Sequence, residues 1–191
     1  YSLLALVLGF WLLRYDYFIG HDGVYYARMA ESIFSGRGIE LNPGEPYLHH
    51  PPLYPFLIGL ANILLRNLEL ALHSVSLLAF AFTIVPLFLL AAEIYSEKTA
   101  HWASILYLTN PHLLSYSGLG LSDSLFTFFV VTELYLIYRL VQDNPQGRSL
   151  GLVIGMATGM ATLTRPEGVI FHLSGLAALC LLSHKSLGWK F

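Results

Sequence analysis

Beyond residue 66, the chain alternates long apolar runs with short polar breaks. A membrane-spanning helix needs about 20 apolar residues, and somewhat shorter runs still cross when the bilayer thins around them. The runs therefore predict five transmembrane helices, some of them short, at 70–92, 101–118, 124–141, 150–164 and 168–183.

The first 13 residues also form an apolar run, little more than half as long as a spanning helix requires. A signal peptide would need a basic stretch before this run and small residues at a cleavage site after it. Neither is present, because the sequence starts at Tyr1 and continues after the run with Arg14, Tyr15 and Asp16. The pattern favours a truncated first transmembrane helix at 1–13, in a single membrane domain that occupies 1–191.

Residues 14–66 interrupt this pattern and predict a loop on one side of the membrane. Residues 14–52 hold eight of the 22 charged residues (10 Lys and Arg plus 12 Asp and Glu). Residues 22–34 carry apolar rows at helical spacing, typical of an amphipathic helix on a membrane surface, and the glycines that follow should end it. A proline-rich loop at 42–52 leads to 53–66, which is too short to span and suits a second interfacial helix.

Basic residues in short loops indicate the cytoplasmic side of a membrane protein. If 53–66 stays at the interface, three polar breaks share one side, and these contain Lys98, then Arg139 and Arg148, then Lys185 and Lys190. The loop 14–66 then lies on the extracytoplasmic side, in a prokaryotic plasma membrane or in the endoplasmic reticulum membrane. A crossing at 53–66 would reverse every later helix.

Composition agrees with a membrane protein. Hydrophobic residues make up 55% of the 191 positions and charged residues 12%, about half the share in soluble domains, and the mean hydropathy is +0.61. The net charge of −2 gives no field for binding nucleic acid. The single cysteine, Cys180, lies in an apolar run, which excludes a disulfide framework within the chain.

Two aspartates stand where helices on the outer face should begin. Asp22 precedes the amphipathic helix and Asp123 precedes the helix at 124–141. Aspartate is a favoured N-cap residue, so each could serve only as a cap. A capping role is compatible with chemistry, because it also fixes a carboxylate in space.

Two histidines, His49 and His50, precede the Pro51-Pro52 pair that returns the chain to the membrane. With an aspartate, adjacent histidines can hold a divalent metal or contact a phosphate. Their spacing is not a metal signature, and two neighbouring loop histidines more often do neither.

Arg165 is expected at the outer end of the helix at 150–164. Its planar guanidinium could neutralise a phosphate, or it could form an interfacial ion pair with Glu167. Both interpretations stand on the sequence alone. Gly151, Gly155 and Gly159 recur at four-residue spacing, which predicts close packing of that helix against another.

An ionisable residue, Glu133, lies near the middle of the predicted helix at 124–141. Such residues are functional candidates in membranes. It lies about 80° around the helix from Asp123, so the two do not share a face. Protonated packing against a neighbouring helix is the favoured interpretation.

Several motifs, in order, resemble the GT-C membrane glycosyltransferases, most closely the glycosyltransferase 39 branch of protein mannosyltransferase and aminoarabinose transferase-like enzymes. The resemblance covers nearly the whole chain. It rests on His21-Asp22-Gly23-Val24-Tyr25-Tyr26, Gly36-Arg37-Gly38, His50-Pro51-Pro52-Leu53-Tyr54-Pro55, Asn110-Pro111, Ser122-Asp123-Ser124 and Leu163-Thr164-Arg165-Pro166-Glu167-Gly168.

The resemblance implies an all-α polytopic membrane fold whose first extracytoplasmic loop contains juxtamembrane amphipathic helices. It implies inverting transfer of a sugar from a polyprenyl-phosphate donor to an acceptor hydroxyl on protein, lipid or glycan, with Asp22 as general base. His49, His50, Asp123 and Arg165 are the candidate substrate- and phosphate-binding residues. The resemblance specifies no cofactor with certainty, and Asp22 and His50 are the candidate ligands if a divalent metal takes part.

The sequence departs from these relatives at two places. Many relatives have an acidic residue and a lysine before the Pro-Pro pair, where this chain has His49 and His50, and many carry a second acidic residue where Gly23 stands.

The alternatives are a transporter with Glu133 as coupling site and a non-catalytic lipid-binding scaffold. A transporter would bury its charges between helices, whereas this chain concentrates them in the outer loop.

Overall fold

A computed structural model describes residues 1–13, 19–42, 44–142, 147–173 and 175–176. The described part is mainly helical, with one short two-stranded antiparallel sheet. In chain order, the elements are α1 Ser2–Leu13, α2 His21–Phe34, β1 Glu40–Asn42, β2 Glu45–Pro46, α3 Leu53–Leu65, α4 Leu68–Ile94, α5 Glu97–Thr109, α6 Pro111–Gly118, α7 Asp123–Gln142 and α8 Gly147–Thr164.

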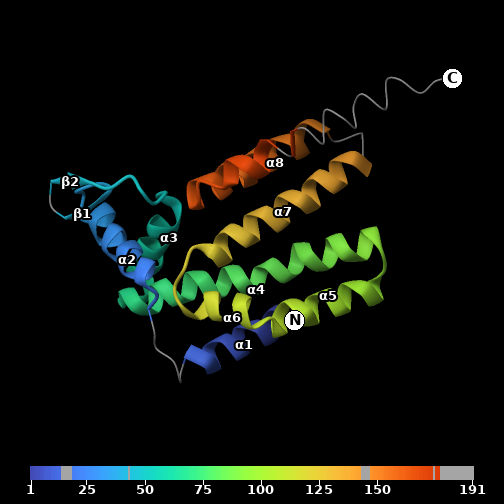
Figure 1. The fold of residues 1–191 in the computed structure, drawn as a ribbon, viewed down its shortest axis with the longest axis horizontal. Helices are drawn as coiled ribbons and strands as arrows, with labels where there is room; N and C mark the ends of the chain where they lie inside the picture. The colour runs from blue at the N-terminus through green and yellow to red at the C-terminus, as the bar shows by residue number, and fades with distance from the viewer. Residues whose placement is uncertain (14–18, 43, 143–146, 174, 177–191) are drawn as a thin grey trace.

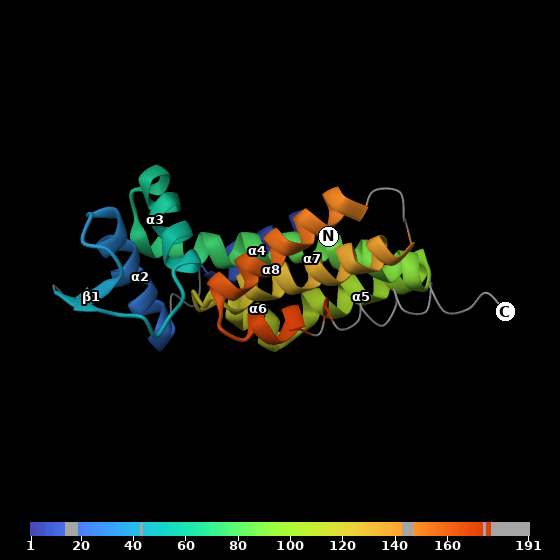
Figure 2. The ribbon, with the colours of Figure 1, turned by 90° about the horizontal axis from the view of Figure 1, so that it is seen from above.

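The helices form a bundle, and two of them, α2 and α3, lie across one end as a pair that we call the cap. α1, α4, α5, α7 and α8 lie side by side along the long axis, whereas α2 and α3 run across the end where α4 begins (Figures 1 and 2). Two described helices, α4 and α7, are long and apolar enough to cross a bilayer, and α1, α3 and α8 contain shorter apolar helices. The mainly helical character is therefore confirmed, and the crossing of the membrane by these helices stays a prediction.

Most predicted helices correspond to observed ones within a few residues. The expected helices at 70–92, 124–141 and 150–164 are α4, α7 and α8, and α2 ends at Phe34, shortly before Gly36 and Gly38, which both have positive φ. Residues 168–173 and 175–176 are helical, and the rest of the expected helix at 168–183 lies outside the described residues.

One predicted helix is wrong. Residues 101–118 form two helices, α5 and α6, which meet at Asn110-Pro111. Pro111 has no N–H to continue the first helix. The Asn110 side chain instead accepts hydrogen bonds from the backbone N–H groups of His112 (3.0 Å) and Leu113 (3.2 Å), which caps α6.

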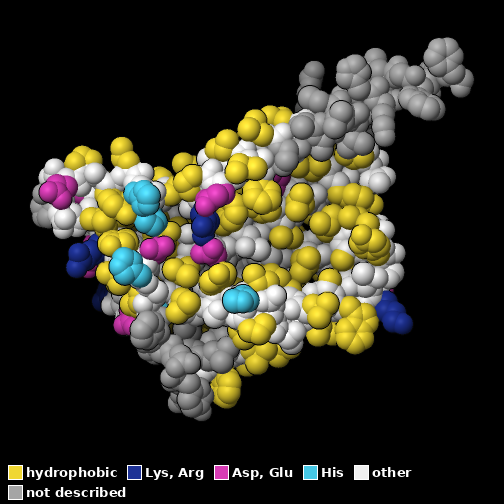
Figure 3. Space-filling model, in the orientation of Figure 1, with side chains coloured by type: hydrophobic (Ala, Val, Ile, Leu, Met, Phe, Trp, Pro, Cys, Tyr) yellow, Lys and Arg dark blue, Asp and Glu magenta, His cyan; other side chains and the backbone are white. Residues whose placement is uncertain are grey.

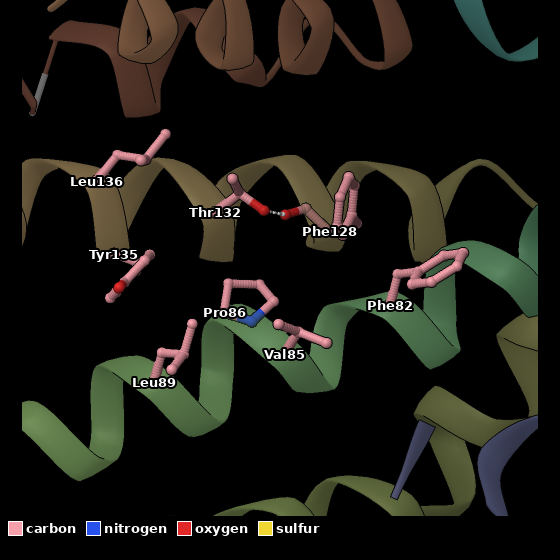
Figure 4. A pocket seen from close by; sticks show the side chains of 8 residues that line it. All are labelled: Phe82, Val85, Pro86, Leu89, Phe128, Thr132, Tyr135 and Leu136. Carbon is pink, nitrogen blue, oxygen red and sulfur yellow. Dashed lines mark hydrogen bonds between the residues drawn. The ribbon is translucent and has the colours of Figure 1, made fainter. Parts of the chain in front are cut away.

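An apolar groove of about 360 Å³ runs between α4 and α7 beside Pro86, which lies inside α4 (Figure 4). The hydroxyl of Thr132 on its wall donates to the carbonyl of Phe128 (2.7 Å), which satisfies this polar group within its own helix. No charged side chain lines the groove. Its lining consists of Phe82, Val85, Pro86, Leu89, Phe128, Thr132, Tyr135 and Leu136.

Buried residues of the cap and of the bundle pack together in one core. Tyr26 of α2, Tyr54 of α3, Leu72 of α4 and Leu125 of α7 belong to one cluster of buried residues. Tyr54 is fully buried, and its hydroxyl lies 2.5 Å from that of Ser76. The cap is therefore packed against the ends of α4 and α7 and holds its position relative to them.

Gly120, in the turn between α6 and α7, combines a positive φ with a close neighbour, so it is predicted to be sensitive to a single added methyl group. Its φ is +67°, and a Cβ there would lie 2.5 Å from a methyl carbon of the buried Leu72. We expect Gly120→Ala to destabilise the fold by about 1–2 kcal/mol from backbone strain alone, seen as a lower midpoint of thermal unfolding in detergent. Gly118→Ala is the control, because it lies in α6 with open space around its Cβ position. Equal midpoints for the two variants would contradict this explanation.

Candidate active site

Asp22 lies in the first turn of α2, but it does not cap the helix. The N-cap residue is Gly20, and no side chain caps this end. The carboxylate is about half exposed, and the nearest basic partner, His21 Nδ1, is 3.7 Å away. The interpretation of Asp22 as a helix cap is therefore wrong, and its carboxylate is accessible to a ligand.

Glycines bring the start of α2 close to the turn that precedes α7. The Gly20 N–H donates to the Leu119 carbonyl (2.9 Å). A Cβ on Gly23 would lie 3.2 Å from the carbonyl oxygen of Gly120 and 3.4 Å from that of Leu119. A side chain at position 23 would therefore crowd the turn that precedes α7.

Asp123 and Arg165 form an ion pair between the start of α7 and the end of α8. Arg165 Nη1 lies 2.5 Å from Asp123 Oδ1, and Nη2 lies 3.4 Å from Glu167 Oε1. Burial lowers the pKa of Arg165, but the hydrogen bond with Glu167 and the charge of Asp123 outweigh it and raise the pKa overall. The pairing of Arg165 with Glu167 is thus confirmed, and Asp123 is a second partner.

His50 faces the same space from the loop after β2. Its Nδ1 lies 3.0 Å from the Tyr47 hydroxyl, and its ring packs edge-on against Tyr26 with centroids 4.9 Å apart. Burial lowers the pKa of His50, and the charge of Asp22 opposes this shift only in part. His49 is exposed, and its ring lies 5.2 Å from that of His50.

The lowered pKa of His50 predicts how stability depends on pH. In the unfolded chain this histidine takes up a proton near its ordinary pKa of 6.5, whereas the folded protein binds it only at lower pH. Stability contributed by neutral His50 is complete above pH 6.5 and is lost as the pH falls from there to the lowered pKa. We expect the unfolding midpoint of His50→Gln to fall less over this range than that of the wild type, whereas parallel pH profiles would contradict this.

Tyr26 is a site residue that the sequence interpretation missed. Its hydroxyl lies 3.0 Å from that of Ser122, the residue before α7, and its side chain is buried. Burial raises its pKa, and the charges of Asp22, Arg165 and Asp123 all act on it. A buried tyrosine hydroxyl usually has a hydrogen-bond partner. A tyrosine on the apolar face of α2 was therefore the sequence feature that could have identified this residue.

The fold brings Asp22, His50, Asp123 and Arg165 close to Tyr26, at the end of the bundle that α2 and α3 cover. Figure 3 shows charged and histidine side chains mainly at the end that holds α2 and the strands, and a largely hydrophobic surface over the rest of that face. Asp22, Asp123 and Glu167 carry negative charge here and Arg165 positive charge. Among the described residues, no three His, Cys, Asp or Glu side chains are grouped so that they could hold a metal ion, so Asp22 and His50 lack a third ligand.

Glu133 and the glycine row of α8 lie away from this cluster. Glu133 is 3% exposed, and its Oε2 has no hydrogen-bond partner within the described part of the chain. The side chain of Glu133 is therefore packed inside the helix bundle. Gly151, Gly155 and Gly159 are exposed, and no described atom lies within 4 Å of the Cβ position of any of them, so the predicted close packing is not found among the described residues.

Comparisons with known proteins show what this chain is similar to. Over 177 residues the chain is 29% identical to an uncharacterized protein of Aquifex aeolicus (strain VF5), an alignment that covers 84% of the chain and 35% of that protein. The chain thus spans about a third of the length of this relative. No solved structure matches the chain. Residues 49–190 match the family described as dolichyl-phosphate-mannose-protein mannosyltransferase, and since this match covers most of the sequence, the chain belongs to that family of membrane glycosyltransferases.

Proposed function

We propose that this chain carries the donor site of a glycosyltransferase that moves a sugar from a polyprenyl phosphate to an acceptor hydroxyl at the extracytoplasmic face. The observation that carries this proposal is the uncapped carboxylate of Asp22, whose charge, like that of Arg165, acts on both Tyr26 and His50 at the end of the bundle that α2 and α3 cross. A lipid-linked sugar phosphate presents its reacting carbon at this depth, because its hydrocarbon chain stays in the bilayer.

Asp22 would act as the general base. The acceptor oxygen attacks the anomeric carbon and transfers its proton to the Asp22 carboxylate as the bond forms. The bond between that carbon and the phosphate oxygen breaks on the opposite face, and the carrier leaves as a polyprenyl phosphate. The anomeric configuration is inverted, and the phosphate needs no acid to leave.

Arg165 would bind the phosphate, and Asp123 would hold its guanidinium in place. Two carboxylates, those of Asp123 and Glu167, already pair with this one cation, so the site is electrostatically unfavourable for a bound phosphate unless additional donors face it. His50 would supply one in the neutral tautomer whose Nδ1 accepts a hydrogen bond from the Tyr47 hydroxyl, because that ring carries its own proton on Nε2. His49, whose ring is exposed and lies 5.2 Å from that of His50, would be a further phosphate-binding residue.

The test is sugar transfer by the complete protein in liposomes supplied with labelled sugar donors. We expect transfer from a polyprenyl-phosphate sugar and none from the matching nucleotide sugar. Transfer from the nucleotide sugar would contradict the proposed donor class. Absence of transfer and of binding with every polyprenyl-phosphate sugar would favour a transporter that uses the buried Glu133, or a non-catalytic lipid-binding scaffold.

A further inference from the structure

The ring of Tyr25, next to Asp22, has no role in this mechanism, and it lies against the rings of Tyr47 and His50. Tyr25 lies one helical turn beyond Asp22, on the same face of α2. Its ring lies 6.1 Å from those of Tyr47 and His50, and the Tyr47 and His50 rings lie 5.6 Å apart and nearly parallel, at 17°. The three rings thus form one continuous surface built from α2 and the loop after β2. We call this surface, made of Tyr25, Tyr47 and His50, the aromatic shelf.

The aromatic shelf is open and lies within reach of the proposed base. Tyr25, Tyr47 and His50 are each partly exposed. Burial and the charges of Tyr25 and Asp22 raise the pKa of Tyr47. The Asp22 carboxylate therefore acts on Tyr47 as well as on its own helix. On one flank, His21 packs edge-on against Tyr25 with centroids 5.1 Å apart.

An aromatic surface bordered by a carboxylate suits a ligand with one apolar and one polar side. A purely apolar chain would leave Asp22 and the histidines without partners, at a cost in desolvation. A pyranose ring has C–H groups that contact the negative face of an aromatic ring, and hydroxyls at its edge that reach carboxylate and imidazole groups. Tyr95 and Trp102 are more exposed than these rings, and neither has a ring contact with another described residue, so interfacial anchoring alone does not require such a cluster.

We propose that the aromatic shelf is a sugar-binding subsite that stacks a pyranose ring beside Asp22. This proposal rests on the proposed glycosyltransferase function. The ring comes either from the donor, as the sugar being transferred, or from a carbohydrate acceptor.

The first experiment compares the affinity of the complete protein for a polyprenyl-phosphate mannose and for the same carrier without sugar. In the wild type the sugar should tighten binding, and Tyr25→Leu should reduce this gain by about threefold to tenfold while binding of the sugar-free carrier is unchanged. Tyr25→Phe keeps the ring and should keep the gain. Tyr95→Leu, at the opposite end of α4, is the matched control.

The second experiment identifies which sugar occupies the aromatic shelf. Saturation-transfer NMR with methyl mannoside, in the presence of sugar-free carrier, should show contact with the sugar ring protons in the wild type and lose it in Tyr25→Leu. If the donor sugar occupies the aromatic shelf, carrier that bears mannose displaces the methyl mannoside; if an acceptor sugar does, the signal persists.

The outcomes separate this proposal from the proposed function. Equal loss of affinity for both carriers in Tyr25→Leu would overturn the sugar subsite, because the ring would then support the phosphate site or the fold. An unchanged sugar gain and an unchanged methyl mannoside signal in Tyr25→Leu would overturn it as well. Failure of the wild type to bind either carrier would overturn the proposed donor instead. Thermal midpoints of the variants identify a folding defect.

Discussion

Replacing Asp22 by asparagine should lower the rate of sugar transfer by about 10²–10⁴-fold, the usual contribution of a general base, while the donor still binds. The amide keeps the shape of the side chain but cannot accept the acceptor proton. The fold should tolerate the change, because the Asp22 carboxylate is about half exposed and caps no helix. The measurements are single-turnover transfer and donor affinity in the complete protein.

The matched control for this variant is Glu31→Gln. Glu31 is an exposed carboxylate on the same helix, and the same loss of charge there should leave transfer within about twofold of the wild type. An unchanged rate in Asp22→Asn would remove the base from the mechanism and leave Asp123 as the next candidate. A loss of donor binding equal to the loss of rate would assign Asp22 to binding instead.

Replacing Arg165 by glutamine should weaken donor binding by about 10- to 100-fold, the range expected for a charge-assisted hydrogen bond to phosphate. The Arg165 side chain is about one-third exposed, so solvent screens its charge only in part. Arg165→Lys should recover a fraction of the affinity, because an ammonium supplies charge without the planar fork. Arg139→Gln is the control, since that guanidinium pairs with Glu93 at the opposite end of the bundle.

A double-variant cycle tests the link between Arg165 and Asp123. If Asp123 acts by holding the guanidinium, Asp123→Asn should change donor affinity in the wild-type background and have no further effect in Arg165→Gln. Independent effects that add in the double variant would show that Asp123 contacts the substrate itself.

The sequence predicted the helices where hydrophobic length dominates and missed the points where single residues decide. The expected ranges for α4, α7 and α8 follow from the size of the apolar runs, which tolerate an error of a few residues. The break at Asn110-Pro111 depends on one missing N–H and one capping side chain inside a continuous apolar run. The exposed glycine row of α8 shows that spacing identifies a small-residue face but not the helix that would cover it.

The polar residues of the candidate site could be identified from the sequence, but the buried contact between them could not. Asp22, His50, Asp123 and Arg165 stood out because polar residues are few in an apolar chain, and the alternation of helices brought them to one end. The sequence does not reveal that Tyr26 contacts Ser122, because these residues are 96 positions apart and their contact depends on how α2 packs against α7. The same holds for the aromatic shelf, whose rings come from two segments of the outer loop.

Rescue of an Asp22→Ala variant by azide tests the central claim most directly. Azide attacks carbon without giving up a proton, so it needs no general base. If Asp22 is the base, the variant should transfer sugar to azide far faster than to its natural acceptor, and the glycosyl azide should have the inverted anomeric configuration. A variant that binds the donor but forms no glycosyl azide, or forms one with retained configuration, would contradict the proposed role of Asp22.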